Sequence, residues 1–251
     1  MDSLTSASAL DLLSRLTYTS AILTSVYFIR RTNSDPNPLL PPHTQDAKTS
    51  ATQSLNKKDF LMTAGNELTM RRHLNFLTAT GIYHALVSAF PARQRPALCP
   101  AYSDSPVDTN LFTWTPHTAS VLGTLISAGV LRLAAYSNLG RSFTFHITKP
   151  SSGLKTTGVH RYVRHPSYTA LLFVGAAMVL LLFRENGLMG CWFPEWFAGA
   201  VDKATLAWAL VVNPILFWLR VRQEEEFLAR TFGTEWEGYC ARTKRFIPGI
   251  F

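Results

Sequence analysis

The chain has 251 residues, of which 47% are hydrophobic and only 16% are charged, yet its formal net charge is +8. This charged fraction is below the roughly 25% of ordinary soluble domains. The basic excess suits nucleic acid, an anionic membrane surface or an anionic ligand, and the placement of the charges has to decide between them.

Five apolar segments follow one another along the chain, at 8–29, 73–90, 116–136, 168–183 and 205–219. The second and third are rich in Ala, Gly, Ser and Thr, small residues that let membrane helices approach closely. Some are shorter than the roughly 20 residues that span a bilayer, so each one taken singly is also compatible with a buried helix of a soluble protein. The first segment lacks the basic region and cleavage site of a signal peptide, and we expect it to be a retained span.

Lys and Arg residues alternate between many and few in the successive connections. The loops 30–72 and 137–167 carry seven and five, the loops 91–115 and 184–204 carry two each, and the tail 220–251 carries six. The positive-inside rule predicts this alternation for a polytopic membrane protein. We therefore expect an all-α bundle of about five transmembrane helices, with a lumenal N-terminus and a cytosolic tail. Basic residues dispersed in this way, without a recognisable binding module, argue against nucleic-acid binding.

Two further features of composition concern the loops. The first loop, at about 30–70, contains the stretch DPNPLLPPH and is expected to be flexible or disordered. The three cysteines show no metal-ligand spacing, so we predict neither a metal site nor a disulfide framework. One pairing, Cys99 with Cys191, stays open because the expected topology puts both on the lumenal side.

The stretch TTGVHRYVRHPSYTA (156–170) precedes the most apolar segment. Pro166 is acceptable in the first turn of a helix, where its missing N–H costs nothing. His165 and Ser167 would then lie at the membrane–cytosol boundary beside unpaired helix N–H groups, which favour anionic groups such as a ligand carboxylate. Tyr168 taken alone is better explained as an anchor at the membrane interface.

The second polar stretch is FWLRVRQEEEFLARTFG (217–233). Arg220 and Glu224 are four residues apart and share one helix face, whereas Arg222 and Glu226 point elsewhere. Taken alone, the first pair is expected to be an exposed salt bridge contributing about 0.3–0.5 kcal/mol. An ionisable pair at the end of a span is nevertheless a candidate functional site.

Together the two stretches closely resemble the signature of the isoprenylcysteine carboxyl methyltransferase family. The resemblance covers about 136–251, and its second block begins at Arg220. The matching positions are Gly158, Arg164, His165, Pro166, Ser167, Tyr168, Arg220, Glu224, Glu225, Leu228, Phe232, Gly233, Tyr239, Arg245 and Pro248. Two positions depart from the family, which usually has Tyr at His160 and Gly at Ala170. For 1–135, the predicted N-terminal transmembrane part, the resemblance rests on hydropathy alone.

The resemblance implies an endoplasmic-reticulum enzyme that transfers a methyl group from S-adenosylmethionine to the C-terminal carboxylate of a prenylated cysteine, in small GTPases and other CaaX-processed proteins. It implies that Arg220 holds the substrate carboxylate and that Glu224 contacts the cofactor, both as catalytic residues. The other cofactor-binding residues that it implies are Ser152, Gly153, Leu154, Lys155, His160, His165, Pro166, Ser167 and Tyr168.

Three alternatives stay open at this point: a membrane phospholipid methyltransferase, a sterol reductase of the same broad superfamily, and a non-catalytic membrane protein that keeps the motif as packing. The sequence also leaves open the oligomeric state and the choice between farnesyl and geranylgeranyl substrates.

Overall fold

The computed structural model describes residues 2–34, 36–37, 67–100, 107–143 and 153–249. Within these ranges the regular elements are helices, and the one pairing of extended residues is an isolated parallel bridge between Val163 and Lys244. The predicted all-α class is therefore confirmed. The predicted disorder of the first loop falls mainly on 38–66, which lie outside the described residues.

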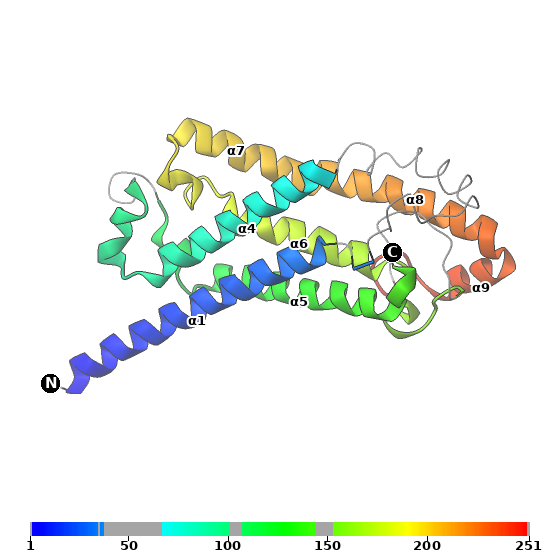
Figure 1. Ribbon diagram of the computed structural model, residues 1–251, viewed down its shortest axis with the longest axis horizontal. Coiled ribbons are helices and arrows are strands. Elements are labelled where there is room, and N and C mark those ends of the chain that lie inside the picture. The colour runs from blue at the N-terminus through cyan, green and yellow to red at the C-terminus, as the bar shows by residue number, and fades with distance from the viewer. Residues whose placement is uncertain (1, 35, 38–66, 101–106, 144–152, 250–251) are drawn as a thin grey trace.

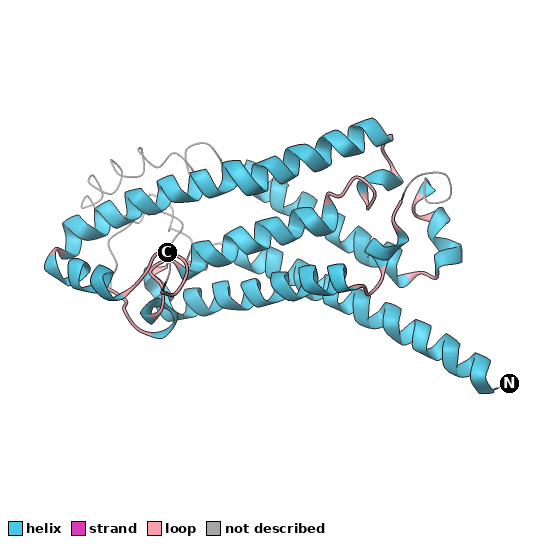
Figure 2. Cartoon of the chain, turned by 180° about the vertical axis from the view of Figure 1, so that it is seen from behind, coloured by secondary structure: helices cyan, strands magenta, loops and turns pink. Residues whose placement is uncertain are grey.

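In the described part of the chain, seven α-helices form an elongated bundle (Figure 1). In Figure 2 the chain is seen from behind, and the N-terminal part of the first helix projects beyond the other helices. The helices are α1 (Asp2–Thr32), α4 (Glu67–Ala89), α5 (Pro116–Leu139), α6 (Pro166–Leu182), α7 (Glu195–Ala207), α8 (Asn213–Phe232) and α9 (Thr234–Arg242). Short 3-10 helices lie at Ala92–Ala97, Thr109–Phe112, Gly140–Ser142, Gly158–Arg161 and Met189–Cys191.

Each predicted apolar segment lies largely within a helix, but the helices extend further. α1 continues to Thr32 and α4 begins at Glu67, so both helices extend into the predicted loop 30–72. Two helical stretches of the described residues, Pro116–Ser142 and Glu195–Phe232, are long and apolar enough to cross a bilayer on their own. α6 is also apolar but has only 17 residues. The helices agree with a membrane protein, and the number of five spans stays a prediction.

The bundle core depends on small residues where helices approach each other. A Cβ atom at Gly81 of α4 would lie 2.4 Å from the Val26 side chain of α1, and one at Gly129 of α5 would lie 2.6 Å from Phe28. Glycine at these two positions therefore permits the close contacts of α1 with α4 and α5. The sequence predicted this use of small residues in the second and third segments.

A π-helical turn, Trp208–Val212, joins α7 to α8 in one continuous helix of 38 residues. Pro214 follows the turn and has no N–H to donate to the carbonyl of Leu210, four residues earlier. The wider turn accommodates this break without ending the helix. At about 1.5 Å per residue, the continuous helix is roughly 57 Å long, which exceeds the roughly 30 Å thickness of a hydrocarbon core.

Cys99 and Cys191 form a disulfide, with their Cα atoms 4.6 Å apart. The bond links the connection between α4 and α5 to the connection between α6 and α7. The pairing that the sequence left open is therefore present, and it could not be decided earlier because residues 92 positions apart in sequence meet only through the fold. We call the region around the bond the disulfide cap; its buried apolar residues are Val87, Cys99, Val107, Leu111, Phe112, Leu188 and Cys191.

Candidate functional site

One cavity of about 450 Å³ lies between α4, α5, α6 and α8. All the predicted site residues that the structure describes line it, and Ser152 lies outside the described residues. They come from three parts of the chain: the segment before α6, the start of α6, and α8. These residues are Gly153, Leu154, Lys155, His160, His165, Pro166, Ser167, Tyr168, Arg220 and Glu224.

The cavity also has a long apolar part. It extends along α6 from Pro166 to Met178, about 18 Å at 1.5 Å per residue. We call this part the apolar limb; its walls come from α4, α6 and the α7–α8 helix, and its lining residues are Leu74, Leu77, Leu171, Val174, Gly175, Met178, Trp208, Leu216 and Phe217. The cavity thus combines a charged end with an elongated hydrocarbon surface.

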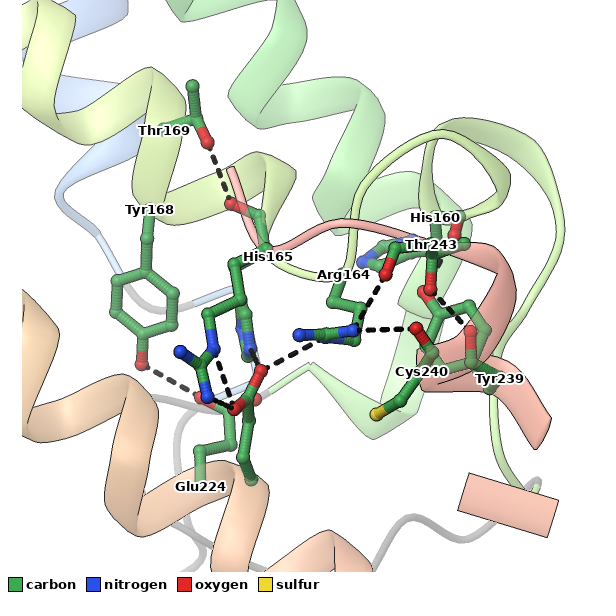
Figure 3. A network of polar contacts seen from close by, with 11 residues as sticks. His160, Arg164, His165, Tyr168, Thr169, Glu224, Tyr239, Cys240 and Thr243 are labelled. Carbon is green, nitrogen blue, oxygen red and sulfur yellow. Dashed lines mark hydrogen bonds and ion pairs between the residues drawn. The ribbon is translucent and has the colours of Figure 1, made fainter. Parts of the chain in front are cut away.

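The start of α6 is held by the segment that follows α9 (Figure 3). The backbone N–H of Arg164 donates to the Lys244 carbonyl at 2.8 Å, and that of His165 donates to the Arg245 carbonyl at 2.9 Å. The Arg164 guanidinium donates to the carbonyls of Cys240 and Thr243, at 3.2 and 2.7 Å. These contacts fix the backbone just before Pro166, the first residue of α6, so the motif enters the cavity in one defined orientation.

Glu225 is the centre of an ionic cluster beneath the cavity. Its Oε1 accepts from Arg164 Nε at 3.0 Å and lies 3.2 Å from His165 Nε2. Its Oε2 accepts from Arg245 Nε at 2.9 Å. The Glu225 side chain is only 11% exposed, so one carboxylate joins α8, the motif and the segment after α9. Glu225 matches the family pattern, but the resemblance implied no role for it in the site.

Arg220, Tyr168 and Glu224 form the charged end of the cavity. The Tyr168 hydroxyl donates to Glu224 Oε2 at 3.0 Å, and Arg220 Nε donates to the same hydroxyl at 3.3 Å. Figure 3 shows Tyr168 reaching from α6 toward Glu224. Arg220 is buried, with 6% of its surface exposed. The alternative of an ordinary surface salt bridge is therefore wrong, because the guanidinium lies inside the protein and faces a cavity.

Arg132 is a lining residue that the sequence analysis did not select. It is buried in α5, where its guanidinium donates to the Thr32 carbonyl at 2.8 Å and to the Ser167 hydroxyl at 2.8 Å. The bond to Ser167 joins α5 to the motif. A signal was present in the sequence, because an arginine within an apolar segment marks a functional or structural site by default.

His160 lies in the 3-10 helix before α6 and is also buried. Its Nδ1 lies 2.6 Å from Asn138 Oδ1, and its carbonyl accepts from the Tyr239 hydroxyl at 2.6 Å. Burial, together with the nearby His165, lowers the pKa of His160 to about 4. The side chain is therefore neutral at physiological pH, as the Tyr of the family would be.

The low pKa of His160 predicts a dependence of stability on pH. In the unfolded chain the His160 side chain binds a proton near pH 6.5. The contribution of neutral His160 to the free energy of unfolding is therefore fully present above that pH and is lost as the pH falls toward 4. Between about pH 7 and about pH 5, the free energy of unfolding should fall by about 2 kcal/mol more in the wild type than in His160→Gln, whose side chain cannot titrate. Thermal unfolding in nanodiscs at the two pH values measures the difference. Equal losses in both proteins would contradict the prediction.

Comparison with known proteins points to the same family as the motifs. Residues 121–230 match the isoprenylcysteine carboxyl methyltransferase family. The resemblance is confirmed for this region. Protein-S-isoprenylcysteine O-methyltransferase A of Arabidopsis thaliana is 30% identical over 130 residues, which are 50% of this chain and 56% of that protein. The Schizosaccharomyces pombe enzyme of the same name is 28% identical over 144 residues, 55% of this chain and 52% of that protein.

The similarity to a Dictyostelium discoideum protein-S-isoprenylcysteine O-methyltransferase is lower, 22% over 129 residues. The chain spans about half the length of the curated relatives that it matches. The matched region, 121–230, includes most of α5, all of α6 and α7 and nearly all of α8, and therefore contains the motif, Arg220 and Glu224.

Proposed function

We propose that the protein transfers a methyl group from S-adenosylmethionine to the C-terminal carboxylate of a prenylated cysteine, giving a methyl ester. One observation carries the proposal: the motif residues and the Arg220–Tyr168–Glu224 group share one cavity with an elongated apolar limb. An acceptor with a carboxylate next to a long hydrocarbon chain matches both parts. The similarity to enzymes named for this reaction supports the same conclusion.

The acceptor carboxylate needs no catalytic base. An α-carboxylate has a pKa near 3.5, so it is already ionised at neutral pH. The protein has to remove its water and hold it in line with the methyl group, and such positioning contributes several kcal/mol. Arg220 is suited to orient the carboxylate because its planar guanidinium can donate to both oxygens. The Tyr168 hydroxyl, which accepts from Arg220 Nε, restricts the guanidinium to one direction.

The charged end is also suited to the methyl donor. When bound, S-adenosylmethionine supplies an electrophilic methyl group on a positively charged sulfur. Glu224 provides a carboxylate that faces the cavity, and the Tyr168 hydroxyl donates to it at 3.0 Å. Gly153, Leu154 and Lys155 line the same end and would cover the donor from the cytosolic side. The cavity volume of about 450 Å³ lies in the range of small-molecule sites.

The proposal includes the placement of the protein in the membrane. We assign about five spans, an integral position in the endoplasmic reticulum, and a cytosolic site within a C-terminal core at 136–251. The charge distribution supports this orientation, because the loop 137–167 and the tail 220–251 carry five and six basic residues. Small GTPases and other CaaX-processed proteins would supply the prenylated cysteine.

The apolar limb predicts how a bulky substitution should act. Gly175 lines the limb from α6, where a Cβ would lie 3.2 Å from Asn213 Nδ2. Gly175→Leu should fill part of the limb and raise KM for a prenylated acceptor by about tenfold, because about two methylene contacts are lost to the acceptor chain. The KM for S-adenosylmethionine should not change. Gly123→Leu is the matched control, since nothing lies within 4 Å of a Cβ there. Equal acceptor KM values in the two variants would contradict the assignment of the limb.

The test of the reaction is methyl transfer in isolated membranes. Labelled S-adenosylmethionine is supplied with N-acetyl-S-farnesylcysteine, and the product is assayed as a base-labile methyl ester. We expect ester formation above the level of membranes that lack the protein. If folded protein binds the donor but forms no ester, the proposal fails, and label in phospholipid would identify the acceptor instead. Binding of NADPH in place of the donor would indicate a reductase.

A further inference from the structure

We propose that the Cys99–Cys191 disulfide forms on the lumenal side of the membrane and fixes the position of α4 relative to α6, the two helices that face each other across the apolar limb. The bond would then control how readily the lipid part of an acceptor is bound. This inference rests on the proposed function, because it takes the apolar limb as the acceptor site.

The disulfide cap holds the far end of α4 by several contacts besides the covalent bond. The Trp192 indole N–H donates to the Tyr83 hydroxyl at 2.7 Å, and the Tyr83 hydroxyl donates to the Leu98 carbonyl. His84 Nε2 lies 3.0 Å from the Leu111 carbonyl. Tyr83 and His84 are residues of α4, whereas Trp192 belongs to the connection after α6. The cap therefore connects the end of α4 to the end of α6.

Both cysteines are buried, with 0% and 1% of their surface exposed. Formation of the bond removes two protons and two electrons from the thiols, which pass to a disulfide oxidant that is itself reduced to a dithiol. Such bonds persist in oxidising compartments. The two loops that carry the cysteines are those with few basic residues, and the positive-inside rule independently puts them in the lumen.

The opposite end of α4 lines the cavity, at Met70, His73, Leu74 and Leu77. α4 lies mainly against α1 and makes few contacts with α6. The disulfide therefore joins, through the connections that follow them, two helices that otherwise barely touch. From Tyr83 to Met70 the helix is about 20 Å long. A tilt of about 10° at the cap would move Met70 by roughly 3–4 Å, nearly the width of a hydrocarbon chain.

The location of the bond is tested in sealed microsomes without any activity measurement. A maleimide–polyethylene glycol reagent is applied after solubilisation in denaturant, with and without prior reduction. We expect one reactive thiol, Cys240, before reduction and three after it. A lumen-targeted oxidant should restore the bond, whereas a cytosol-restricted one should not. Three reactive thiols in the untreated protein would overturn the proposal.

The role of the bond is tested by direct binding, so that its failure is distinct from failure of the methyl-transfer proposal. Binding of a fluorescent S-farnesylcysteine analogue is measured in wild-type protein before reduction, after reduction with dithiothreitol and after reoxidation, with labelled S-adenosylmethionine as the second ligand. We expect reduction to weaken analogue binding by about fivefold, reversibly, with donor binding unchanged. Cys99→Ser with Cys191→Ser should reproduce the reduced state.

Val87→Ala is the matched control, because Val87 is fully buried in the disulfide cap and its truncation leaves the bond intact. This variant should lower thermal stability but keep analogue binding. Unchanged analogue binding after reduction would overturn the proposed role of the bond. Parallel loss of donor binding and analogue binding would also overturn it, because such a loss indicates general unfolding. Normal binding without methyl transfer would instead reject the proposed function alone.

Discussion

Arg220→Ala is expected to lower kcat/KM for a prenylated acceptor by roughly 100-fold, equivalent to about 3 kcal/mol. The guanidinium is buried at the charged end of the cavity, so the acceptor carboxylate would lose its orienting partner where water replaces it poorly. Methyl-ester formation with N-acetyl-S-farnesylcysteine, at matched protein concentration, measures the effect. Binding of labelled S-adenosylmethionine should remain, because Glu224 and the motif are unchanged.

Arg230→Ala provides the matched control on the same helix. The Arg230 side chain is 75% exposed and pairs with Glu226, so its removal should leave kcat/KM within about twofold of the wild-type value. Arg220→Lys is a second comparison: it keeps the charge but not the planar pair of donors, and its activity should lie between those of the wild type and Arg220→Ala. If Arg220→Ala lost expression and donor binding while residual folded protein stayed active, Arg220 would be a packing residue.

Glu225→Gln is expected to lower the free energy of unfolding by about 3 kcal/mol, because breaking a buried ion pair leaves a charge without its partner. The carboxylate serves Arg164, His165 and Arg245 at once, and a neutral amide cannot accept equally from all three. The melting temperature of the purified protein in nanodiscs measures the effect. Donor binding should weaken too, since the motif backbone would lose part of its support.

The neighbouring Glu226→Gln is a control of identical chemistry one position along the helix. The Glu226 side chain is 64% exposed and pairs with an arginine that is itself in solvent, so its substitution should change stability by less than about 0.5 kcal/mol. Similar melting temperatures for the two variants would contradict the assignment of Glu225 as the centre of the cluster.

The helices and the cavity lining could be predicted because their signals are local. Apolar segments predicted the helices, and the motif with the later Arg–Glu pair selected residues that share one cavity. The sequence could not predict that Glu224 faces the cavity while Glu225 binds Arg164. Successive residues on a helix point about 100° apart, so only the position of α8 decides which carboxylate faces the cavity and which faces Arg164.

Long-range contacts were the other part that sequence did not reveal. The carbonyl groups of Cys240 and Thr243 accept hydrogen bonds from Arg164. Every residue type has a backbone carbonyl, so the sequence does not show which carbonyls will act as acceptors. The pairing of Cys99 with Cys191 similarly depends on which loops meet, and three cysteines do not determine this. Arg132 is different, because an arginine within an apolar segment is itself a signal in the sequence.

The π-helical turn at Trp208–Val212 accommodates one extra residue between the α7 and α8 parts of one long helix. A π turn contains about one residue more than an α turn, and each residue rotates the helix by about 100°. Because the wider turn absorbs that residue, deletion of a single residue there would restore a regular α-helix and leave Arg220 and Glu224 facing the cavity. Insertion of one residue into the regular α-helix after the turn would instead rotate both side chains by about 100°. Homologous genes that lack one codon in this stretch should therefore encode a regular α-helix here, with the positions of Arg220 and Glu224 still facing the cavity.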